Sequence, residues 1–191
     1  MTLKTFLLTT ILAGAGAGSA LAQDASRWGG FYGGLSVAAF GGFEDFEPFG
    51  TDDYNLIGTS FGVFGGYTYA SGAMAYGAEI ALNSGDAYEQ DLAGGDGYPE
   101  YNYTNTFELK GRVGYATGNA LVYGTLGYVF GEYEYSGTFY DADGVLYGLG
   151  VDYALNDRFF AGVEYVRRDL ETDYPTKAGV NTLTIRGGVS F

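Results

Sequence analysis

Seven charged side chains carry most of the chemistry that this sequence offers. Each lies in a stretch where apolar residues alternate with small ones, and each falls on the alternate set that is not apolar: Glu79, Glu108, Lys110, Arg112, Asp152, Glu164 and Arg186. Paired carboxylates can act as acid and base in glycoside hydrolysis. Carboxylates beside arginine and lysine are more typical of buried ion pairs, because a charge removed from water needs a partner. The pattern therefore predicts an ion-pair network rather than a catalytic pair.

The composition excludes most other chemistry. Among 191 residues there is no Cys and no His, which rules out disulfides, thiol nucleophiles and the usual zinc or haem sites, so no cofactor is expected. Nine Lys+Arg against 23 Asp+Glu give a net charge of -14, which repels phosphate backbones and argues against nucleic-acid binding. The combination of 34 Gly with 19 Tyr and 14 Phe at only 17% charged residues is unusual for a water-soluble domain.

The first 22 residues have the pattern of an export signal. Lys4 precedes an apolar stretch at 6–17, and Ala20-Leu21-Ala22 supplies a small-x-small cleavage site. The apolar stretch is too short to cross a bilayer as a helix. We therefore expect a cleaved signal peptide at 1–22 and one exported domain at 23–191.

The remainder of the chain alternates with a period of two, which is the strand signal. Eight windows show it: 29–40, 57–69, 76–83, 105–115, 121–131, 145–154, 158–166 and 182–191. Tight connections carrying good turn pairs (70–73, 116–120, 155–157) alternate with long ones (41–56, 84–104, 132–144, 167–181). Short turns on one side and long loops on the other predict an up-and-down antiparallel meander.

The two faces of these strands differ in a way that favours a lipid-facing barrel. In water the polar face of a sheet would be rich in hydrated side chains. Here that face consists mainly of Gly, Ala, Ser and Thr plus the seven charges, which suits a crowded interior, whereas the apolar face carries no charge. Hydrocarbon demands such an uncharged exterior, and closure removes unpaired edges. We expect an all-β fold, an eight-stranded antiparallel up-and-down transmembrane β-barrel.

Aromatic residues on the apolar face support this assignment. They gather at the short-turn end of the strands, where a membrane interface favours them. A soluble core would not concentrate its aromatic residues at one end. The predicted interface residues are Phe31, Tyr69, Tyr76, Tyr115, Tyr153, Phe159 and Phe191.

A transmembrane helix is the main structural alternative. Residues 54–78 carry no charge and are numerous enough to span a bilayer. Six of them are glycines, and a Ser71-Gly72 turn interrupts the stretch. Two strands and a turn describe the segment better than one helix does.

Several motifs in order resemble the small eight-stranded outer-membrane barrels of Gram-negative bacteria, the OmpA-type transmembrane domain and the opacity-protein-like porin family. They are WGGFYGG at 28–34, FGGY at 64–67, GLGVDYA at 148–154, VEY at 163–165 and IRGGVSF at 185–191. The last motif is similar to the terminal strand signal that the barrel-assembly machinery reads, although Gly187 stands where that signal usually has a bulkier residue. The resemblance implies Phe191 as the assembly signal, and it implies periplasmic chaperones and the assembly machinery as partners.

These features together predict a protein of the cell outer membrane with a structural and surface-interaction role. We expect it to maintain envelope integrity, with the ion pairs plugging the lumen and the acidic loops outside the cell. It is not expected to be an enzyme, because small outer-membrane barrels that are enzymes depend on a histidine base. A narrow, weakly cation-preferring porin is the alternative function, and a soluble periplasmic ligand-binding barrel is a third.

The long connections are strongly acidic. Only Lys177 and the pair Arg167 and Arg168 oppose their acids, so the loops could attract divalent cations that bridge them to anionic lipopolysaccharide. Asp141-Ala142-Asp143-Gly144 begins like a calcium loop but lacks the later ligands, and a solvated acidic face is the simpler interpretation. The seventeen acids are Glu44, Asp45, Glu47, Asp52, Asp53, Asp86, Glu89, Asp91, Asp96, Glu100, Glu132, Glu134, Asp141, Asp143, Asp169, Glu171 and Asp173.

Overall fold

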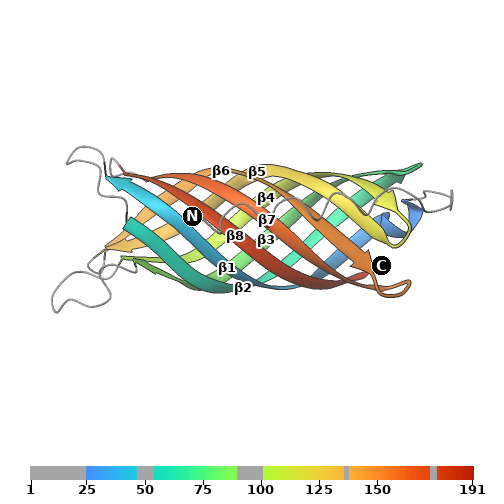
Figure 1. Cartoon of the computed structure of the whole chain (residues 1–191), viewed down its shortest axis with the longest axis horizontal. Helices are drawn as coiled ribbons and strands as arrows, with labels where there is room; N and C mark the ends of the chain where they lie inside the picture. Colours follow the sequence, from blue (N-terminus) through green and yellow to red (C-terminus); the bar gives the residue numbers. More distant parts are fainter. Residues whose placement is uncertain (1–24, 47–53, 90–100, 136–137, 173–175) are drawn as a thin grey trace, which may run out of the picture.

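The computed structural model describes residues 25–46, 54–89, 101–135, 138–172 and 176–191, and over these residues the chain forms a closed barrel (Figure 1). A short 3-10 helix, η1, precedes eight strands that pair antiparallel in chain order, and the last strand pairs with the first. The predicted eight-stranded antiparallel up-and-down barrel is confirmed. The elements are η1 (Ser26–Trp28), β1 (Gly30–Phe46), β2 (Tyr54–Ser71), β3 (Met74–Glu89), β4 (Tyr101–Thr117), β5 (Ala120–Tyr135), β6 (Thr138–Ala154), β7 (Phe159–Thr172) and β8 (Thr176–Ser190).

The pairing register fixes the tilt of the strands. Following paired residues once round the barrel from Leu35 leads back to Asp45, ten positions further along β1. A stagger of this size in eight strands corresponds to a tilt of roughly 40°. Strands of 14 to 18 residues at this tilt make a cylinder about 40 Å tall. It therefore exceeds the apolar band of outer-membrane barrels, which is about 25 Å tall.

Tight turns connect the strands at one end of the barrel, as the sequence predicted. Gly72 and Gly118 adopt positive φ angles of 59° and 58°, which favour glycine, in the β2–β3 and β4–β5 turns. In the β6–β7 turn the side chain of Asn156 accepts hydrogen bonds from the backbone N–H groups of Arg158 and Phe159, both at 2.9 Å. These local contacts explain why the three short connections were visible in the sequence.

The other ends of the strands extend further than predicted. Most of the expected long connections are strand: β1 continues to Phe46, β3 to Glu89 and β7 to Thr172, while β5 and β6 are separated only by 136–137. Acids that were assigned to loops, such as Glu44 and Asp141, therefore lie on strands. The predicted bounds of the long connections were wrong because the strand windows were ended where the apolar face became polar, although the alternation itself goes on.

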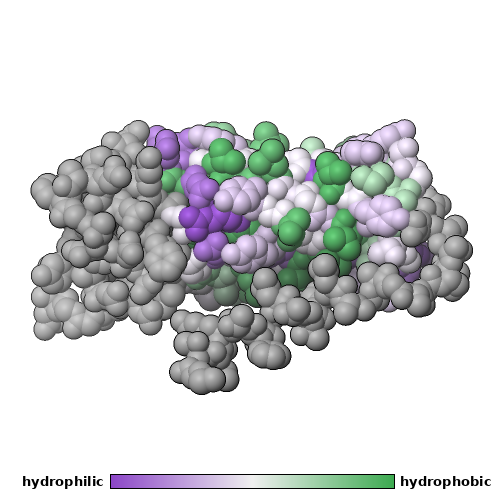
Figure 2. All heavy atoms as spheres, turned by 45° about the horizontal axis from the view of Figure 1, so that its top comes forward, coloured by the Kyte–Doolittle hydropathy of each residue, from purple (hydrophilic) through white to green (hydrophobic). Residues whose placement is uncertain are grey.

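Outward side chains are apolar over most of the wall. Leu149, Phe31 and Ile185 expose 70%, 67% and 67% of their surface, and apolar residues recur across the face shown in Figure 2. The uncharged segment 54–78 is the β2–β3 hairpin rather than a helix. Among the described residues, no helix is long and apolar enough to cross a membrane.

The interior has three layers along the barrel axis. Near the tight turns it contains small and aromatic side chains, including Trp28, Tyr32, Phe64 and Phe160. The charged residues follow in the middle. Toward the other end an aliphatic cluster fills the interior, formed by Val129, Leu146, Val166, Leu170 and Val180 with Phe40 packed against it.

The charged lumen as candidate functional site

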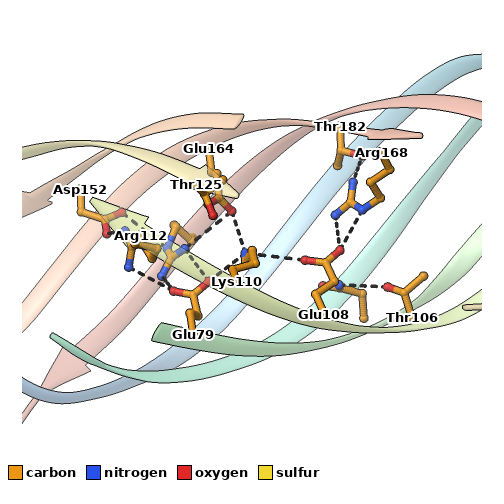
Figure 3. A network of polar contacts seen from close by, with 12 residues as sticks. Glu79, Thr106, Glu108, Lys110, Arg112, Thr125, Asp152, Glu164, Arg168 and Thr182 are labelled. Carbon is orange, nitrogen blue, oxygen red and sulfur yellow. Dashed lines mark hydrogen bonds and ion pairs between the residues drawn. The ribbon is translucent and has the colours of Figure 1, made fainter. Parts of the chain in front are cut away.

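Alternation along the strands turns all seven predicted charged side chains into the lumen. Each is at most 7% exposed. The strand register places the charged residues at neighbouring levels. Glu79 on β3 pairs with Lys110 on β4. Asp152 on β6 and Arg186 on β8 both pair with Gly162 of β7, which lies between them. The side chains come from β3, β4, β6, β7 and β8 and converge in the middle of the barrel, as Figure 3 shows for most of them.

Glu79 is the centre of the network. Its carboxylate lies 2.8 Å from Lys110 Nζ, 3.1 Å from Arg112 Nη1 and 2.6 Å from Arg186 Nη2. The hydroxyl of Tyr32 donates a further hydrogen bond to Glu79 Oε2 at 2.9 Å and accepts one from Arg112 at the same distance. Four polar groups are thereby fixed around one carboxylate, and removing that carboxylate would leave three cations facing one another.

The other three acids contact the bases that surround Glu79. Asp152 Oδ2 lies 2.7 Å from Arg112 Nη2, and Glu164 Oε2 lies 3.1 Å from Lys110 Nζ. Glu108 Oε2 lies 3.6 Å from Lys110 Nζ. Lys110, Arg112 and Arg186 are thus each shared between at least two acids, so these residues form a continuous network rather than separate pairs.

Arg168 belongs to this network, although the sequence interpretation grouped it with Arg167 at the loops. Its guanidinium pairs with Glu108 and donates to the hydroxyl of Thr182 (Figure 3). Arg168 shares its face of β7 with Glu164, four positions earlier, and this parity is the signal that could have revealed it. With Arg168, the buried charges of the described lumen are four acids and four bases, so they balance.

Aromatic rings pack against the charged network on the side of the tight turns. Arg112 Cζ lies 3.7 Å from the ring centroid of Tyr123, and Arg186 Cζ lies 3.9 Å from that of Phe64. A ring face attracts a cation, most strongly where water is excluded. The sequence interpretation gave no role to these inner rings.

Glycines make room for these rings. A Cβ at Gly34 would lie 2.6 Å from Phe64 Cζ, and a Cβ at Gly66 would lie 2.5 Å from Tyr32 Oη. The far ends of these rings therefore lie over glycines of the neighbouring strand, which is one reason for the high glycine content. Ala at these positions would force the rings, and the cations above them, out of place.

Little free space remains in this layer. A cavity of about 20 Å³ lies among Glu79, Glu108, Lys110, Arg168 and Arg186. A water molecule needs a cavity of about 10–15 Å³ on this measure, so the space is large enough for about one water. No group of three or more Asp or Glu in the described part of the chain is arranged to hold a metal ion.

The seven predicted interface aromatics all face outward near the tight turns. Their exposed fractions range from 41% for Tyr115 to 85% for Phe191, and each lies within three residues of a strand end. Further outward aromatics lie toward the opposite end of the strands, including Phe107, Tyr128 and Tyr165. There the hydroxyl of Tyr128 donates to Asp143, and that of Tyr165 donates to Asn181 at 3.0 Å. This second set was present in the apolar windows of the sequence but was not recognised as a group.

The structure describes only some of the seventeen acids of the predicted long connections. Glu47, Asp52, Asp53, Asp91, Asp96, Glu100 and Asp173 lie outside the described residues. Asp141, Asp143, Asp169 and Glu171 lie on the outward faces of β6 and β7, where Asp143 pairs with Glu171 in the register. The acidic surface is therefore built in part on the barrel wall.

A closed barrel with an apolar exterior and a charged interior defines an integral membrane protein of the outer-membrane type. Residues 10–191 match the family model described as outer membrane protein beta-barrel domain, and the chain belongs to this family. It is 30% identical over 164 residues to a 22 kDa outer membrane protein of Rhizobium leguminosarum bv. viciae, covering 82% of this chain and 72% of that protein. The resemblance inferred from the motifs is confirmed.

Solved structures share the fold at low sequence identity. Neisserial surface protein A is 13% identical, covers 84% of this chain and 97% of its own, and superposes with a TM-score of 0.62. Ail of Yersinia pestis is 15% identical, with 85% and 99% coverage and a TM-score of 0.53. OprG of Pseudomonas aeruginosa is 15% identical, with 85% and 96% coverage and a TM-score of 0.51. The protein is thus an outer-membrane β-barrel in a lipid and lipopolysaccharide environment.

Proposed function

We propose that this barrel has a structural and surface-interaction role in the outer membrane and that its lumen is closed. The observation that carries the proposal is Glu79, which is held by Lys110, Arg112 and Arg186 in the middle of the barrel. On this proposal the chain stabilises the envelope as a rigid wall element and presents an acidic surface outside the cell.

Closure follows from the energetics of the network. Opening a pore would require breaking several buried ion pairs at once, and each charge left without its partner would be strongly destabilising. The space remaining among these side chains has room for about one water. An eight-stranded barrel is just wide enough for its side chains to fill it.

The extracellular surface is the second part of the proposal. Short turns of outer-membrane barrels face the periplasm, which directs the extended ends of β6 and β7 out of the cell. Asp143 and Asp169 then lie on the outer wall beyond the apolar residues Val145 and Tyr147. We propose that divalent cations bridge such acids to anionic lipopolysaccharide.

The remaining expectations belong to the same proposal. Residues 1–22 act as a cleaved signal peptide, and Phe191 is read by the assembly machinery after delivery by periplasmic chaperones. No enzymatic activity is proposed, since the chain has no histidine base and its inner carboxylates are engaged by arginine and lysine.

Single-channel recording on the refolded protein tests closure. We expect no stable openings in planar bilayers, and we expect Glu79→Ala to create ion-conducting events because three cations lose their common partner. Ile80→Ala, at the adjacent outward position, is the matched control and should stay closed. Frequent openings of the unmodified protein that favour cations would instead support a narrow porin, which the outward acids favour.

A further inference from the structure

We propose that residues 25–28 form a stopper that closes the periplasmic mouth of the barrel, independently of the charged network. The inference extends the closed lumen proposed above and adds a second level of closure to it. It rests on how η1 and the residue before it pack into the barrel, and on which turns they contact.

The stopper fills a mouth that the strands leave unfilled. Three of the inner residues nearest the tight turns are small, namely Ala75 on β3, Ala116 on β4 and Ala154 on β6, whereas Leu121 on β5 and Phe160 on β7 are large. Trp28 lies among them at 7% exposure, with its ring centroid 6.1 Å from that of Phe160 in an edge-on arrangement. One large ring therefore occupies the space that three alanines leave.

The segment is fastened to all three periplasmic turns. The N–H of Ala25 donates to Gly72 O in the β2–β3 turn at 2.8 Å. Arg27 Nη1 donates to Asn119 Oδ1 in the β4–β5 turn at 2.6 Å, and Arg27 Nη2 lies 3.5 Å from Asp157 Oδ1 in the β6–β7 turn. These contacts come from strands on different sides of the barrel, so the segment crosses the mouth.

Gly30 lets the chain turn back over the mouth. Its φ angle of 115° is a conformation that residues with a side chain rarely adopt, and a Cβ there would lie 2.8 Å from Phe191 O. The bend is therefore encoded in the sequence. Within the described ranges Trp28 Nε1 is buried without a hydrogen-bond partner, so the contacts found for the indole there are packing contacts.

Thiol accessibility tests the stopper, because the chain has no cysteine of its own. A single thiol is introduced by Ala116→Cys, at a site 0% exposed beneath η1, and is labelled with a charged methanethiosulfonate reagent in the refolded barrel. Ser71→Cys, at an exposed strand end, gives the unprotected rate. We expect the thiol at position 116 to react at least about tenfold more slowly, because labelling requires the segment to open.

Removing the ring should abolish this protection. Trp28→Ala should raise labelling at position 116 at least about tenfold, and Arg27→Ala should raise it less, because labelling follows the population of the open segment. Trp28→Phe and Arg158→Ala are matched controls that keep an aromatic ring and remove a neighbouring exposed arginine, and both should stay protected. Heat-modifiable gel mobility shows that each variant is folded. If Trp28→Ala does not fold, the increase in labelling at position 116 is measured with Arg27→Ala instead.

A second thiol separates this inference from the closed network. Thr125→Cys lies in the lumen above Tyr123 at a site 6% exposed. It should stay protected in Trp28→Ala, because the charged layer still closes the lumen. If positions 116 and 125 were both labelled in Trp28→Ala, the result would support the stopper and refute the closed network. Full reactivity at position 116 with the segment intact, or full protection without Trp28, would refute the stopper.

Discussion

The middle of the barrel and the end opposite the tight turns differ in the polarity of their inner and outer faces. In the middle, apolar side chains such as Leu149 and Ile185 face outward, and charges such as Glu79 and Arg186 face inward. At the end of β7 opposite the tight turns, Leu170 lies inside at 6% exposure while its neighbours Asp169 and Glu171 are outside and exposed. The strands are continuous through both regions, so the backbone is the same and only the distribution of polarity is reversed.

The reversal reflects the surroundings of each region. Hydrocarbon tolerates an apolar exterior and penalises charge, whereas water favours a polar exterior over an apolar core. The aliphatic cluster of Val129, Leu146, Val166, Leu170 and Val180 resembles the core of a soluble barrel. The position at which the pattern reverses therefore marks the outer boundary of the membrane more directly than strand length does.

The largest expected effect concerns the charged middle. Glu79→Gln keeps the shape of the side chain but removes the charge that three bases share. Breaking a buried ion network by removing one partner costs about 3–5 kcal/mol, so we expect a loss of that size in the free energy of unfolding. Urea titration of the lipid-reconstituted barrel, followed by fluorescence of Trp28, the single tryptophan, measures it. Asp141→Asn, at an exposed position, should change nothing, and an equally small effect of Glu79→Gln would remove the contrast between the regions.

The same contrast explains what the sequence could and could not predict. In the middle, alternation put Glu108, Lys110 and Arg112 on one face, and the structure places them there. At residues 167–172 the one apolar residue, Leu170, lies on the opposite parity to the apolar set of 159–165, and the segment was interpreted as a loop. Arg168 was missed for this reason. Partner choice within the lumen depends on the stagger between distant strands, which no local pattern contains.

The next largest effect concerns the outer face of the middle region. Leu149→Arg replaces an outward side chain that is 70% exposed on the apolar wall with a cationic one. Arginine near the bilayer midplane costs about 2–4 kcal/mol, and the cost falls to about 0–1 kcal/mol near the interfaces. Asn105→Arg, at an exposed polar position of β4, is the matched variant and should be close to neutral. Equal costs for the two substitutions in urea titrations would place both positions in the same environment.

A smaller effect is expected inside the barrel at the end opposite the tight turns. Leu170→Ala removes part of an aliphatic cluster that also contains Val166 and Val180. Leu-to-Ala changes in a packed core cost about 2–5 kcal/mol, and the lower end applies where a site near the end of a barrel can relax. Glu171→Ala, at the adjacent outward position, should cost much less. Equal losses for both would show that this end of the lumen is hydrated rather than packed.

The smallest effect separates two adjacent arginines. Arg167 faces outward and pairs with Asp169 at 2.7 Å, with side-chain exposures of 32% and 51%, whereas Arg168 faces inward and pairs with Glu108, which is 2% exposed. Because an exposed ion pair contributes about 0.2–1 kcal/mol and is screened by salt, Asp169→Asn should shift stability by that amount at low ionic strength and by less at high salt. Arg168→Gln leaves a buried carboxylate without a strong partner, so its larger loss should hardly depend on salt. If both variants responded to salt alike, the inward and outward faces of β7 would be equally solvated, and the boundary inferred from the reversal would be misplaced.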